Sequence, residues 1–275
     1  MPELPEVETI ARDVDREVAG RTIVGVTVTK PDVLREVTPR ALAPRVRGAR
    51  IERAWRRAKH IVITLSTGEH LVIQPRFTGG LLVATDDTPP AELAYSTLAF
   101  ALDDGRSLHY RDIRRLGTVA LMPEARFQAY MGELGVEPLS DAFTDDALAA
   151  LVARSGQPIK KVLMDQYKIV GVGNIYANEA LWRAGIDPSR AARTLTRDHV
   201  VALRGHVVDV LREAIAQRGS SFRDYRDALG ESGQYVDFLA AYGRGGLPCK
   251  RCGTRLTETH EIDGRQTVLC HRCQS

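Results

Sequence analysis

Cysteine is scarce in this chain of 275 residues, and all four cysteines lie between residues 249 and 273. The rest of the sequence therefore has no disulfide framework, and such a cluster in a chain that starts without a secretory leader indicates a bound metal. Long apolar runs are also missing, so no segment reaches the roughly 20 residues that a membrane-spanning helix requires. The N-terminus is acidic, unlike a signal peptide. We therefore expect a cytoplasmic protein with no membrane partner.

Two common catalytic signatures are absent as well. The chain contains neither a phosphate-binding P-loop nor the Gly-x-Ser-x-Gly turn of serine hydrolases. What is present is the composition of a globular protein, with 44% hydrophobic and 27% charged residues. The length is sufficient for two domains and a small appendage, each domain with a core of its own.

The net charge of +3 hides an uneven distribution of basic residues. Residues 244–275 contain six Lys or Arg against three acidic residues, which accounts for the whole excess. Residues 40–59 contain eight Lys or Arg and one acidic residue. Two separate basic segments favour a polyanionic partner such as nucleic acid, but a basic run is more often a solvated face. Charge alone leaves both interpretations open.

The spacing of apolar residues divides the chain into a β-rich first half and a helical second half. Residues 4–18 have helical spacing, and residues 21–122 contain short β-patterned segments joined by Gly and Asp turns, typical of a sandwich or a barrel. Residues 135–141 have the composition of a linker. Helical spacing then returns in four segments: 145–154, 158–166, 173–184 and 197–218. Residues 219–243, rich in Gly, Ser and charge, are expected to form a loop.

The residues that follow the initiator methionine indicate a candidate nucleophile. Removal of Met1, which a small second residue permits, would leave Pro2 with a free secondary amine. Such an amine can attack a carbonyl-like carbon and form an iminium ion, and an ordinary α-amino pKa of roughly 7.7–8 leaves a neutral fraction near pH 7. Glu3 could transfer a proton in the same step. Met-Pro starts are common and most have no such meaning, so this motif alone does not identify an enzyme.

The clustered cysteines have the spacing of a zinc site. Cys249 and Cys252 form one Cys-x2-Cys pair, and Cys270 and Cys273 form a second pair after 17 intervening residues. Each pair can place two thiolates on one tetrahedral ion, and the residues between them read as a hairpin that turns at Asp263-Gly264. Four thiolates leave no open coordination position for catalysis. We therefore predict one structural Zn2+, with a redox pair as the alternative.

A second candidate site lies at the turn between two of the expected helices. Residues 165–179 pass through Gly171-Val172-Gly173 to Asn174, where a new helix is expected to begin. The amides at the start of that helix and the Asn174 side chain form a group of donors suited to a phosphate. The glycines do not form a dinucleotide-binding loop, because a helix precedes them and Tyr176 occupies the position of the third glycine.

These motifs, in this order, resemble those of the formamidopyrimidine-DNA glycosylase/endonuclease VIII family over essentially the whole chain. The start Pro2-Glu3-Leu4-Pro5-Glu6 is similar to the formamidopyrimidine branch, since the endonuclease VIII branch usually has Gly in place of Leu4. Residues 56–60 resemble the family's lysine-bearing β-hairpin, and residues 163–179 resemble its helix–two-turns–helix segment. Tyr242-Gly243-Arg244 and the cysteine hairpin complete the series. Agreement of four motifs in order makes the resemblance specific.

The resemblance implies an α+β protein with several domains. We expect an N-terminal catalytic β-sandwich flanked by helices over residues 1–134, a linker over 135–145 and a helix–two-turns–helix domain over 146–243. Residues 219–243 would form a loop of that domain that closes over a flipped base, and residues 244–275 would form a zinc β-hairpin finger. The resemblance also implies a monomer. Its implied partner is double-stranded DNA that contains oxidised bases or abasic sites.

The resemblance also implies a reaction. Enzymes of this family flip the damaged nucleotide out of the duplex, because its C1′ is inaccessible within the stack. Pro2 would attack C1′ while Glu3 protonates the opening sugar, which expels an oxidised purine such as a formamidopyrimidine or 8-oxoguanine. The iminium ion would then acidify the C2′ proton, so that β- and δ-elimination cut the strand on both sides. Lys59 and Arg265 would assist these steps or hold flanking phosphates, and Glu6 would belong to the proton network around Pro2.

Further residues are implied as contacts to DNA: Phe77, Tyr95, Arg114, Leu116, Arg154, Lys160, Asn174 and Tyr242. Phe77 stands where the family usually has methionine, Leu116 where it has phenylalanine, and Tyr95 where it often has histidine. An apolar side chain wedged between base steps is a general device, so Phe77 and Leu116 can still replace the flipped base in the stack. Arg114 keeps the position expected to probe the unpaired base. The lesion-reading residues are therefore altered, whereas the catalytic ones are intact.

Three other functions remain open. The altered lesion-reading residues allow a specificity for oxidised pyrimidines, as in endonuclease VIII. A non-catalytic protein that binds damaged DNA would keep the helical and zinc parts, but Pro2 and Glu3 together argue against it. A zinc-ribbon adaptor explains only about the last 30 residues and leaves the N-terminus unexplained.

Overall fold

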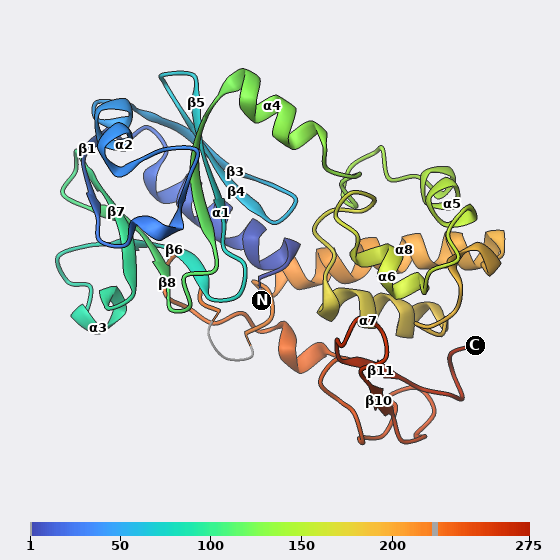
Figure 1. The fold of residues 1–275 in the computed structure, drawn as a ribbon. Helices are drawn as coiled ribbons and strands as arrows, with labels where there is room; N and C mark the ends of the chain where they lie inside the picture. The colour runs from blue at the N-terminus through green and yellow to red at the C-terminus, as the bar shows by residue number, and fades with distance from the viewer. Residues whose placement is uncertain (1, 222–224) are drawn as a thin grey trace. The chain divides into compact units, whose positions relative to one another are not determined.

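The structure is a computed structural model that describes residues 2–221 and 225–275. Two features of the sequence analysis fall outside these ranges: Met1, whose removal would free the Pro2 nitrogen, and residues 222–224 of the expected loop. Figure 1 shows the chain as a ribbon whose colour follows residue number. The mixed α+β class that the sequence predicts is confirmed.

The chain divides into two compact units. The first consists of Met1–Gly132 and Gln217–Gln234, and the second consists of Glu133–Ala216 and Tyr235–Ser275. This division differs from the one expected from the sequence, in which residues 219–243 belong to the helical domain. The physical reason is that residues near position 220 bond to the first helix of the chain, as described for the site below.

Two β-sheets form the body of the first unit (Figure 1). One has the strand order β1-β7-β8-β6, with all pairs antiparallel: Ile23–Val28, Ser96–Leu102, Ser107–Asp112 and Gly79–Ala84. The other has the order β2-β9-β5-β4-β3, with β2 parallel to β9 and the other pairs antiparallel: Leu34–Arg35, Thr118–Pro123, Glu69–Gln74, His60–Leu65 and Ile51–Arg57. The expected β-sandwich is confirmed.

Five helical segments accompany these sheets: α1 (Leu4–Val18), η1 (Pro31–Val33), α2 (Pro39–Val46), α3 (Pro90–Leu93) and α4 (Glu124–Gly132). The sequence pattern of residues 21–122 predicts β structure, so α2 and α3 correct that expectation. Helix α2 begins where it does because Thr38 Oγ1 accepts a hydrogen bond from the Ala41 amide at 3.3 Å, and because Pro39 suits a first helical turn.

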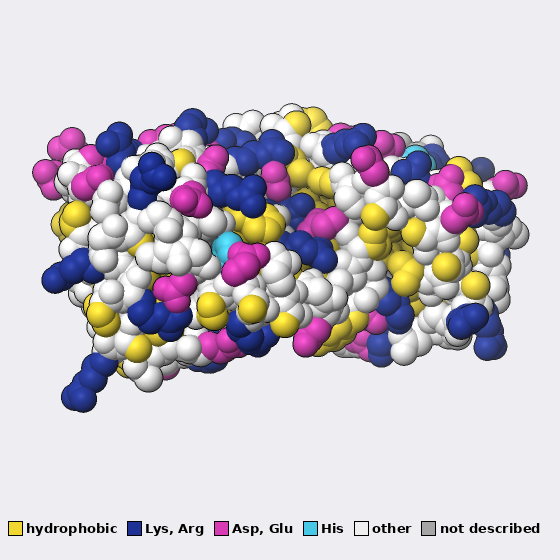
Figure 2. All heavy atoms as spheres, turned by 90° about the horizontal axis from the view of Figure 1, so that it is seen from above, with side chains coloured by type: hydrophobic (Ala, Val, Ile, Leu, Met, Phe, Trp, Pro, Cys, Tyr) yellow, Lys and Arg dark blue, Asp and Glu magenta, His cyan; other side chains and the backbone are white. Residues whose placement is uncertain are grey.

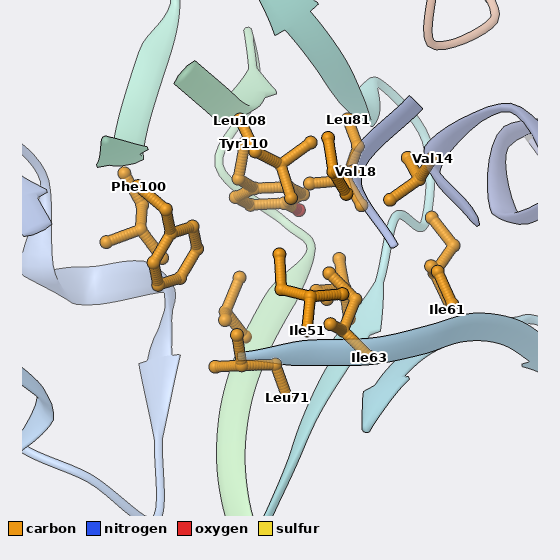
Figure 3. Packing of buried hydrophobic residues seen from close by; sticks show 14 of the residues in the cluster. Val14, Val18, Ile51, Ile61, Ile63, Leu71, Leu81, Phe100, Leu108 and Tyr110 are labelled. Carbon is orange, nitrogen blue, oxygen red and sulfur yellow. The ribbon is translucent and has the colours of Figure 1, made fainter. Parts of the chain in front are cut away.

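The core of the first unit lies between the two sheets and one face of α1 (Figure 3). Val14 and Val18 of α1 lie with Leu81 of β6 and Ile61 of β4, and all four side chains are buried. Helix α1 contacts β3 and β6, which are edge strands of the two sheets. Burying one such side chain is worth roughly 1.5–3 kcal/mol, whereas an N-cap is worth ~1 kcal/mol. Packing therefore holds α1 against the sandwich, and its cap decides where it begins.

The second unit is mostly helical and ends in a short β-hairpin. Its elements are α5 (Asp145–Ala153), α6 (Ile159–Met164), α7 (Asn174–Ala184), η2 (Ala192–Thr194), α8 (Arg197–Ala216), η3 (Tyr235–Phe238), β10 (Thr257–Thr259) and β11 (Thr267–Leu269). Each α-helix begins and ends within two residues of its predicted bounds. Among the described residues, no helix combines the length and the hydropathy that crossing a bilayer demands.

The basic segment 40–59 is partly neutralised by carboxylates from other elements. Arg45 of α2 forms an ion pair with Glu69 of β5, and Arg56 of β3 forms one with Glu8 of α1 at 2.7 Å. On the face drawn in Figure 2, Lys and Arg side chains (dark blue) stand beside Asp and Glu side chains (magenta). Local ion pairs therefore reduce the positive charge that the sequence assigns to this segment.

Candidate active site

Pro2 and Glu3 stand at the start of α1, and both are buried. Glu3 is the N-cap residue, and its carboxylate accepts a hydrogen bond from the Glu6 amide. The Glu6 carboxylate in turn accepts from the Glu3 amide at 2.8 Å, which completes a reciprocal capping box. Glu3 and Glu6 are only 2% and 1% exposed. The candidate nucleophile is therefore adjacent to a helix start that two buried acids hold in place.

Glu6 also connects this helix start to the segment Gln217–Gln234. Its second oxygen accepts a hydrogen bond from the Ser220 amide at 2.7 Å, and the Tyr225 hydroxyl donates to the Glu6 carbonyl at 3.3 Å. Gly219 has φ +84°, and a Cβ there would lie 2.8 Å from Glu6 Oε1. Position 219 thus requires glycine both for its backbone angle and for this close approach. Glu6, which the sequence assigns to a proton network, joins the candidate nucleophile to a distant segment.

Arg218 anchors the same segment through two buried carboxylates. Its guanidinium contacts Asp13 of α1 and Asp227, both at 2.5 Å. Burial alone would lower the pKa of Arg218, but the hydrogen bonds to Asp227 and Asp13 raise it, so the residue stays charged. This triad has no signal in the local sequence, because Asp13 and Arg218 lie 205 positions apart.

Lys59 lies in a two-residue turn between β3 and β4, and its side chain is half-buried. Ala58 takes a left-handed φ of 55°, which an alanine rarely adopts. Arg56 stabilises the turn, since it donates to the Ala58 carbonyl at 3.0 Å while it is paired with Glu8 of α1. The turn that presents Lys59 is therefore tied to the same helix that begins at the Glu3 cap.

Three lesion-reading candidates of the first unit are exposed apolar side chains. Phe77 is 48% exposed, Tyr95 50% and Leu116 43%. The guanidinium of Arg114 lies over the Phe77 ring, 5.1 Å from its centre. Ile113, which directly precedes Arg114 and was not expected to contact DNA, is 47% exposed. Large apolar side chains left in solvent on neighbouring loops indicate a contact surface.

Asn174 is the first residue of α7, as expected for a donor at a helix start. The turn before it is organised by Gln166, whose amide nitrogen donates to the carbonyls of Met164 and Val172 at 2.8 and 2.9 Å. The Gln166 side-chain oxygen accepts from the Gly171 amide at 2.9 Å. One side chain thus satisfies three backbone groups of the turn that leads into α7.

Arg265 is exposed immediately after the tip of the C-terminal hairpin. The tip has the expected turn, because Asp263 and Gly264 both have positive φ angles, 53° and 65°. The Arg265 amide donates to the Ile262 carbonyl at 3.1 Å and closes the turn. The hairpin therefore presents the Arg265 side chain to solvent, where a phosphate could reach it.

Lys160 does not fit the phosphate contact expected from the sequence. Its side chain is fully buried, and its ammonium donates to the Gln266 carbonyl and to Thr267 Oγ1, both at 2.7 Å. A charge that is buried and bonded in this way is not open to a phosphate at the surface. Lys160 instead fastens α6 to the hairpin that bears Arg265, which corrects the sequence-based assignment.

Asn178 is a further structural residue that the sequence analysis missed. It is fully buried, and its amide nitrogen donates to the Asn174 carbonyl at 2.7 Å. Its oxygen accepts from the Val268 amide of β11 at 2.8 Å. Asn178 thus links the start of α7, where Asn174 stands, to the hairpin. Only the tertiary contact reveals this role, because a lone asparagine within a helix carries no pattern.

Tyr242 and Arg154 complete the residues expected to contact DNA. Tyr242 is half-buried, and its amide donates to the buried Glu179, which also accepts from the amides of Ala240 and Ala241. Burial raises the pKa of Glu179, and these three hydrogen bonds oppose that rise. Arg154 is exposed at the end of α5. The Tyr242 backbone is therefore well anchored, and Arg154 is open to solvent.

The four cysteines form one cluster, as their spacing predicts. All four Sγ atoms of Cys249, Cys252, Cys270 and Cys273 lie within 4.8 Å of one another. Four thiol donors at this separation suit one tetrahedral ion and leave no position for a substrate. The donor set and its geometry therefore fit a structural Zn2+.

Three family models match successive parts of the chain. The formamidopyrimidine-DNA glycosylase N-terminal domain matches residues 1–119, and the formamidopyrimidine-DNA glycosylase H2TH domain matches residues 134–226. The zinc finger found in FPG and IleRS matches residues 246–275. Together with the cysteine cluster, the last match shows that the chain binds one structural zinc.

Whole proteins of known identity match from end to end. The formamidopyrimidine-DNA glycosylase of Chloroflexus aggregans is 44% identical over 100% of this chain and 98% of its own, and that of Herpetosiphon aurantiacus is 40% identical over 100% of both. The crystal structure of MutM (Fpg) from Thermus thermophilus has a TM-score of 0.87 at 36% identity, covering 99% of this chain and 98% of that one. Wild-type Lactococcus lactis Fpg bound to a DNA containing N7-benzyl-Fapy-dG has a TM-score of 0.92 at 29% identity, covering 100% of both. The capped Pro2-Glu3 start, the fold and these matches over the full length show that this protein belongs to the formamidopyrimidine-DNA glycosylase family, the DNA glycosylases of base-excision repair.

Proposed function

We propose that this protein removes oxidised purines, such as formamidopyrimidines and 8-oxoguanine, from double-stranded DNA and then cuts the DNA at the abasic site. The observation that carries this proposal is the buried, capped start of α1, where Glu3 directly follows Pro2, whose nitrogen becomes a free secondary amine once Met1 is removed. The DNA complexes of the Lactococcus lactis Fpg relative, one with a Fapy-dG derivative and one with an abasic site, support the choice of substrate.

In the first step, Pro2 and Glu3 would break the bond between the base and the sugar. The Pro2 lone pair forms a bond to C1′ as the C1′–base bond breaks, and the amine proton leaves with the base. Glu3 gives a proton to the ring oxygen O4′, so that the sugar opens and an iminium ion joins Pro2 to C1′. The capping box fixes the Glu3 carboxyl group at the helix start, one residue after Pro2, before the substrate binds, which would lower the entropic cost of this step.

In the second step, the iminium ion would draw electrons away from C2′. Loss of a C2′ proton expels the 3′ phosphate by β-elimination, and a further elimination expels the 5′ phosphate. Water then hydrolyses the remaining iminium ion and restores the free Pro2 amine. We assign Lys59 to this elimination chemistry or to a flanking phosphate, because its turn is tied to α1 by Arg56 and Glu8.

The remaining site residues are assigned to DNA binding. Arg265, Asn174, Arg154 and Tyr242 are assigned to phosphates, which position a duplex without reading its sequence. Phe77, Leu116, Arg114 and Tyr95 are assigned to the gap left by the flipped base. We also propose that residues 219–243 cover that base, because Glu6 connects Ser220 to the start of α1. Since the substrate would be chromosomal DNA, we place the enzyme in the bacterial cytosol, at the nucleoid.

A lesion panel tests the proposed substrate. Duplexes that contain a formamidopyrimidine, 8-oxoguanine or thymine glycol, each opposite all four bases, should be cut fastest at the oxidised purines. Single-turnover rates on denaturing gels give the comparison. Faster excision of thymine glycol would establish an oxidised-pyrimidine specificity instead, which the names of the curated relatives do not favour. Tight binding without any strand cleavage would leave only a non-catalytic DNA-binding protein.

The affinity for DNA should fall steeply with salt, because the assigned contacts are mostly to phosphates. A protein that makes 6–10 phosphate contacts loses about 10³–10⁵ in affinity between 50 and 200 mM salt. Fluorescence anisotropy over this range should show a steep slope of log affinity against log salt concentration. Arg265→Ala should reduce the magnitude of this slope by about 1, because one phosphate contact is lost. Arg197→Ala, which removes an exposed arginine paired with Asp146, serves as the matched control and should leave the slope unchanged. A flat salt response of the wild-type protein would contradict the assignment.

A further inference from the structure

Asp112 is a buried carboxylate at the end of β8 that joins two loops of the first unit. Only 2% of its surface is exposed. Its Oδ1 accepts from Thr78 Oγ1 at 2.5 Å and from the Arg114 amide at 3.2 Å. Its Oδ2 accepts from the Gly117 amide at 2.8 Å and from the Tyr110 hydroxyl at 3.4 Å. One side chain therefore bonds to the loop before β6 and to the loop between β8 and β9.

Gly79, at the start of β6, and Gly117, in the loop between β8 and β9, pack closely against the hydroxyl of Tyr110, which is fully buried. A Cβ added to Gly79 would lie 2.5 Å from the Tyr110 hydroxyl oxygen, and one added to Gly117 would lie 2.0 Å from it. Burial and the nearby charge of Asp112 raise the pKa of Tyr110 well above its usual value, so the hydroxyl keeps its proton and donates it to the carboxylate. The two loops are locked together around this pair.

The residues held by this anchor are the neighbours of the lesion-reading side chains. Phe77 precedes Thr78, Leu116 precedes Gly117, and the Arg114 amide is itself bound to the carboxylate. The Arg114 guanidinium already stacks on the Phe77 ring. Residues 76 and 115, both arginines, take left-handed φ angles of 54° and 52°, which persist only where the surroundings enforce them. One buried group is thus bonded to the chain at, or next to, each of three exposed side chains.

We propose that Asp112 is a positioning residue for lesion recognition, because its carboxylate holds Phe77, Arg114 and Leu116 as a preformed wedge that enters the duplex. This inference rests on the proposed function, since the wedge has a purpose only where a nucleotide leaves the stack. The wedge matters most when a paired, stacked base has to be extruded. It matters least at an abasic site, where there is no base to unstack.

The test compares two substrates with the full-length enzyme. Asp112→Asn keeps the shape of the side chain but replaces one accepting oxygen by a donor that faces N–H and O–H groups. Single-turnover excision of 8-oxoguanine should fall about 10- to 100-fold, as expected for a lost hydrogen bond to a charged group. Cleavage of a preformed abasic-site duplex should stay within about threefold of wild type. Insertion of the wedge unstacks the base opposite the lesion, so 2-aminopurine at that position becomes more fluorescent. After mixing with DNA, this fluorescence should rise more slowly for Asp112→Asn than for the wild-type enzyme.

Two further variants keep the test decisive. Thr78→Val removes the hydroxyl that donates the shortest hydrogen bond to Asp112. It should also slow excision of 8-oxoguanine more than cleavage of the abasic-site duplex, and it provides the test if Asp112→Asn folds poorly. Tyr110→Phe removes only the 3.4 Å contact and should have the smallest effect. Equal losses on both substrates, or unchanged excision of 8-oxoguanine, would overturn the role of Asp112. Failure of the wild-type enzyme on every lesion would instead overturn the proposed function.

Discussion

Replacing Pro2 with alanine should lower the rate of strand cleavage at an abasic site by at least about 10²-fold, the lower end of what a single reacting group contributes. Alanine still offers an amine, but its imine must gain a proton before it can draw electrons from C2′. The secondary amine of proline forms an iminium ion whose positive charge needs no such protonation. Borohydride trapping on an abasic-site duplex measures the difference directly, because it reduces the covalent adduct and makes it permanent.

The matched control for this variant is Pro5→Ala, which changes a proline in the first turn of α1 and leaves the N-terminal residue intact. It should retain most of the trapped adduct. Mass spectrometry of each preparation should show that Met1 has been removed, since a retained methionine blocks the nitrogen. A wild-type enzyme that is active with Met1 in place, or a Pro2→Ala variant that cleaves at the normal rate, would rule out Pro2 as the nucleophile.

Loss of the zinc should weaken DNA binding while the first unit stays folded. Zinc contributes about 10–16 kcal/mol to the folding of zinc-finger peptides, so Cys252→Ser should release the metal and unfold the hairpin. Because Arg265 stands on that hairpin, the affinity for DNA should fall at least about tenfold, as for a lost phosphate or base contact. The first unit should stay folded, since its core contains no part of the cluster. Zinc content by atomic absorption, anisotropy and near-UV circular dichroism give the three readings.

His271→Ala is the matched control for the cysteine variant. His271 is exposed beside Cys270 and is not part of the cluster. This variant should keep one zinc per chain and normal affinity. Unchanged DNA binding by a zinc-free Cys252→Ser protein would show that the hairpin does not contact DNA, and a loss of the near-UV signal from the whole protein would show that zinc supports more than the hairpin.

Features set by near neighbours could be predicted from the sequence. Helix α1 was expected with its observed bounds of 4–18; its capping box was not, although it needs only Glu3 and Glu6, three positions apart. The hairpin turn needs only the Asp263-Gly264 pair, which takes the expected left-handed angles. The short helix α2 was missed although Thr38 and Pro39 form a usable start signal, because a helix of eight residues has too few turns to show its period.

Lys160 shows where such reasoning fails. In the sequence it is a positive charge near the start of a helix, in a protein expected to bind DNA, and a phosphate contact was the natural interpretation. The structure buries it against the Gln266 carbonyl and Thr267, more than a hundred positions away. Periodicity reports which face of a helix is apolar, but it does not report that a distant hairpin supplies acceptors for a buried ammonium.

The sequence by itself determined the family and the zinc ligands, and it supplied Pro2 as the candidate nucleophile, because these follow from residue types at fixed positions or short spacings along the chain. Only the tertiary structure decided which polar groups are internal. Asp112 between two loops, Asn178 against β11 and Asp13 against Arg218 are all buried and joined to partners from distant segments. A buried polar group is stable only when such partners complete its hydrogen bonds, and no local pattern specifies where in the chain those partners lie.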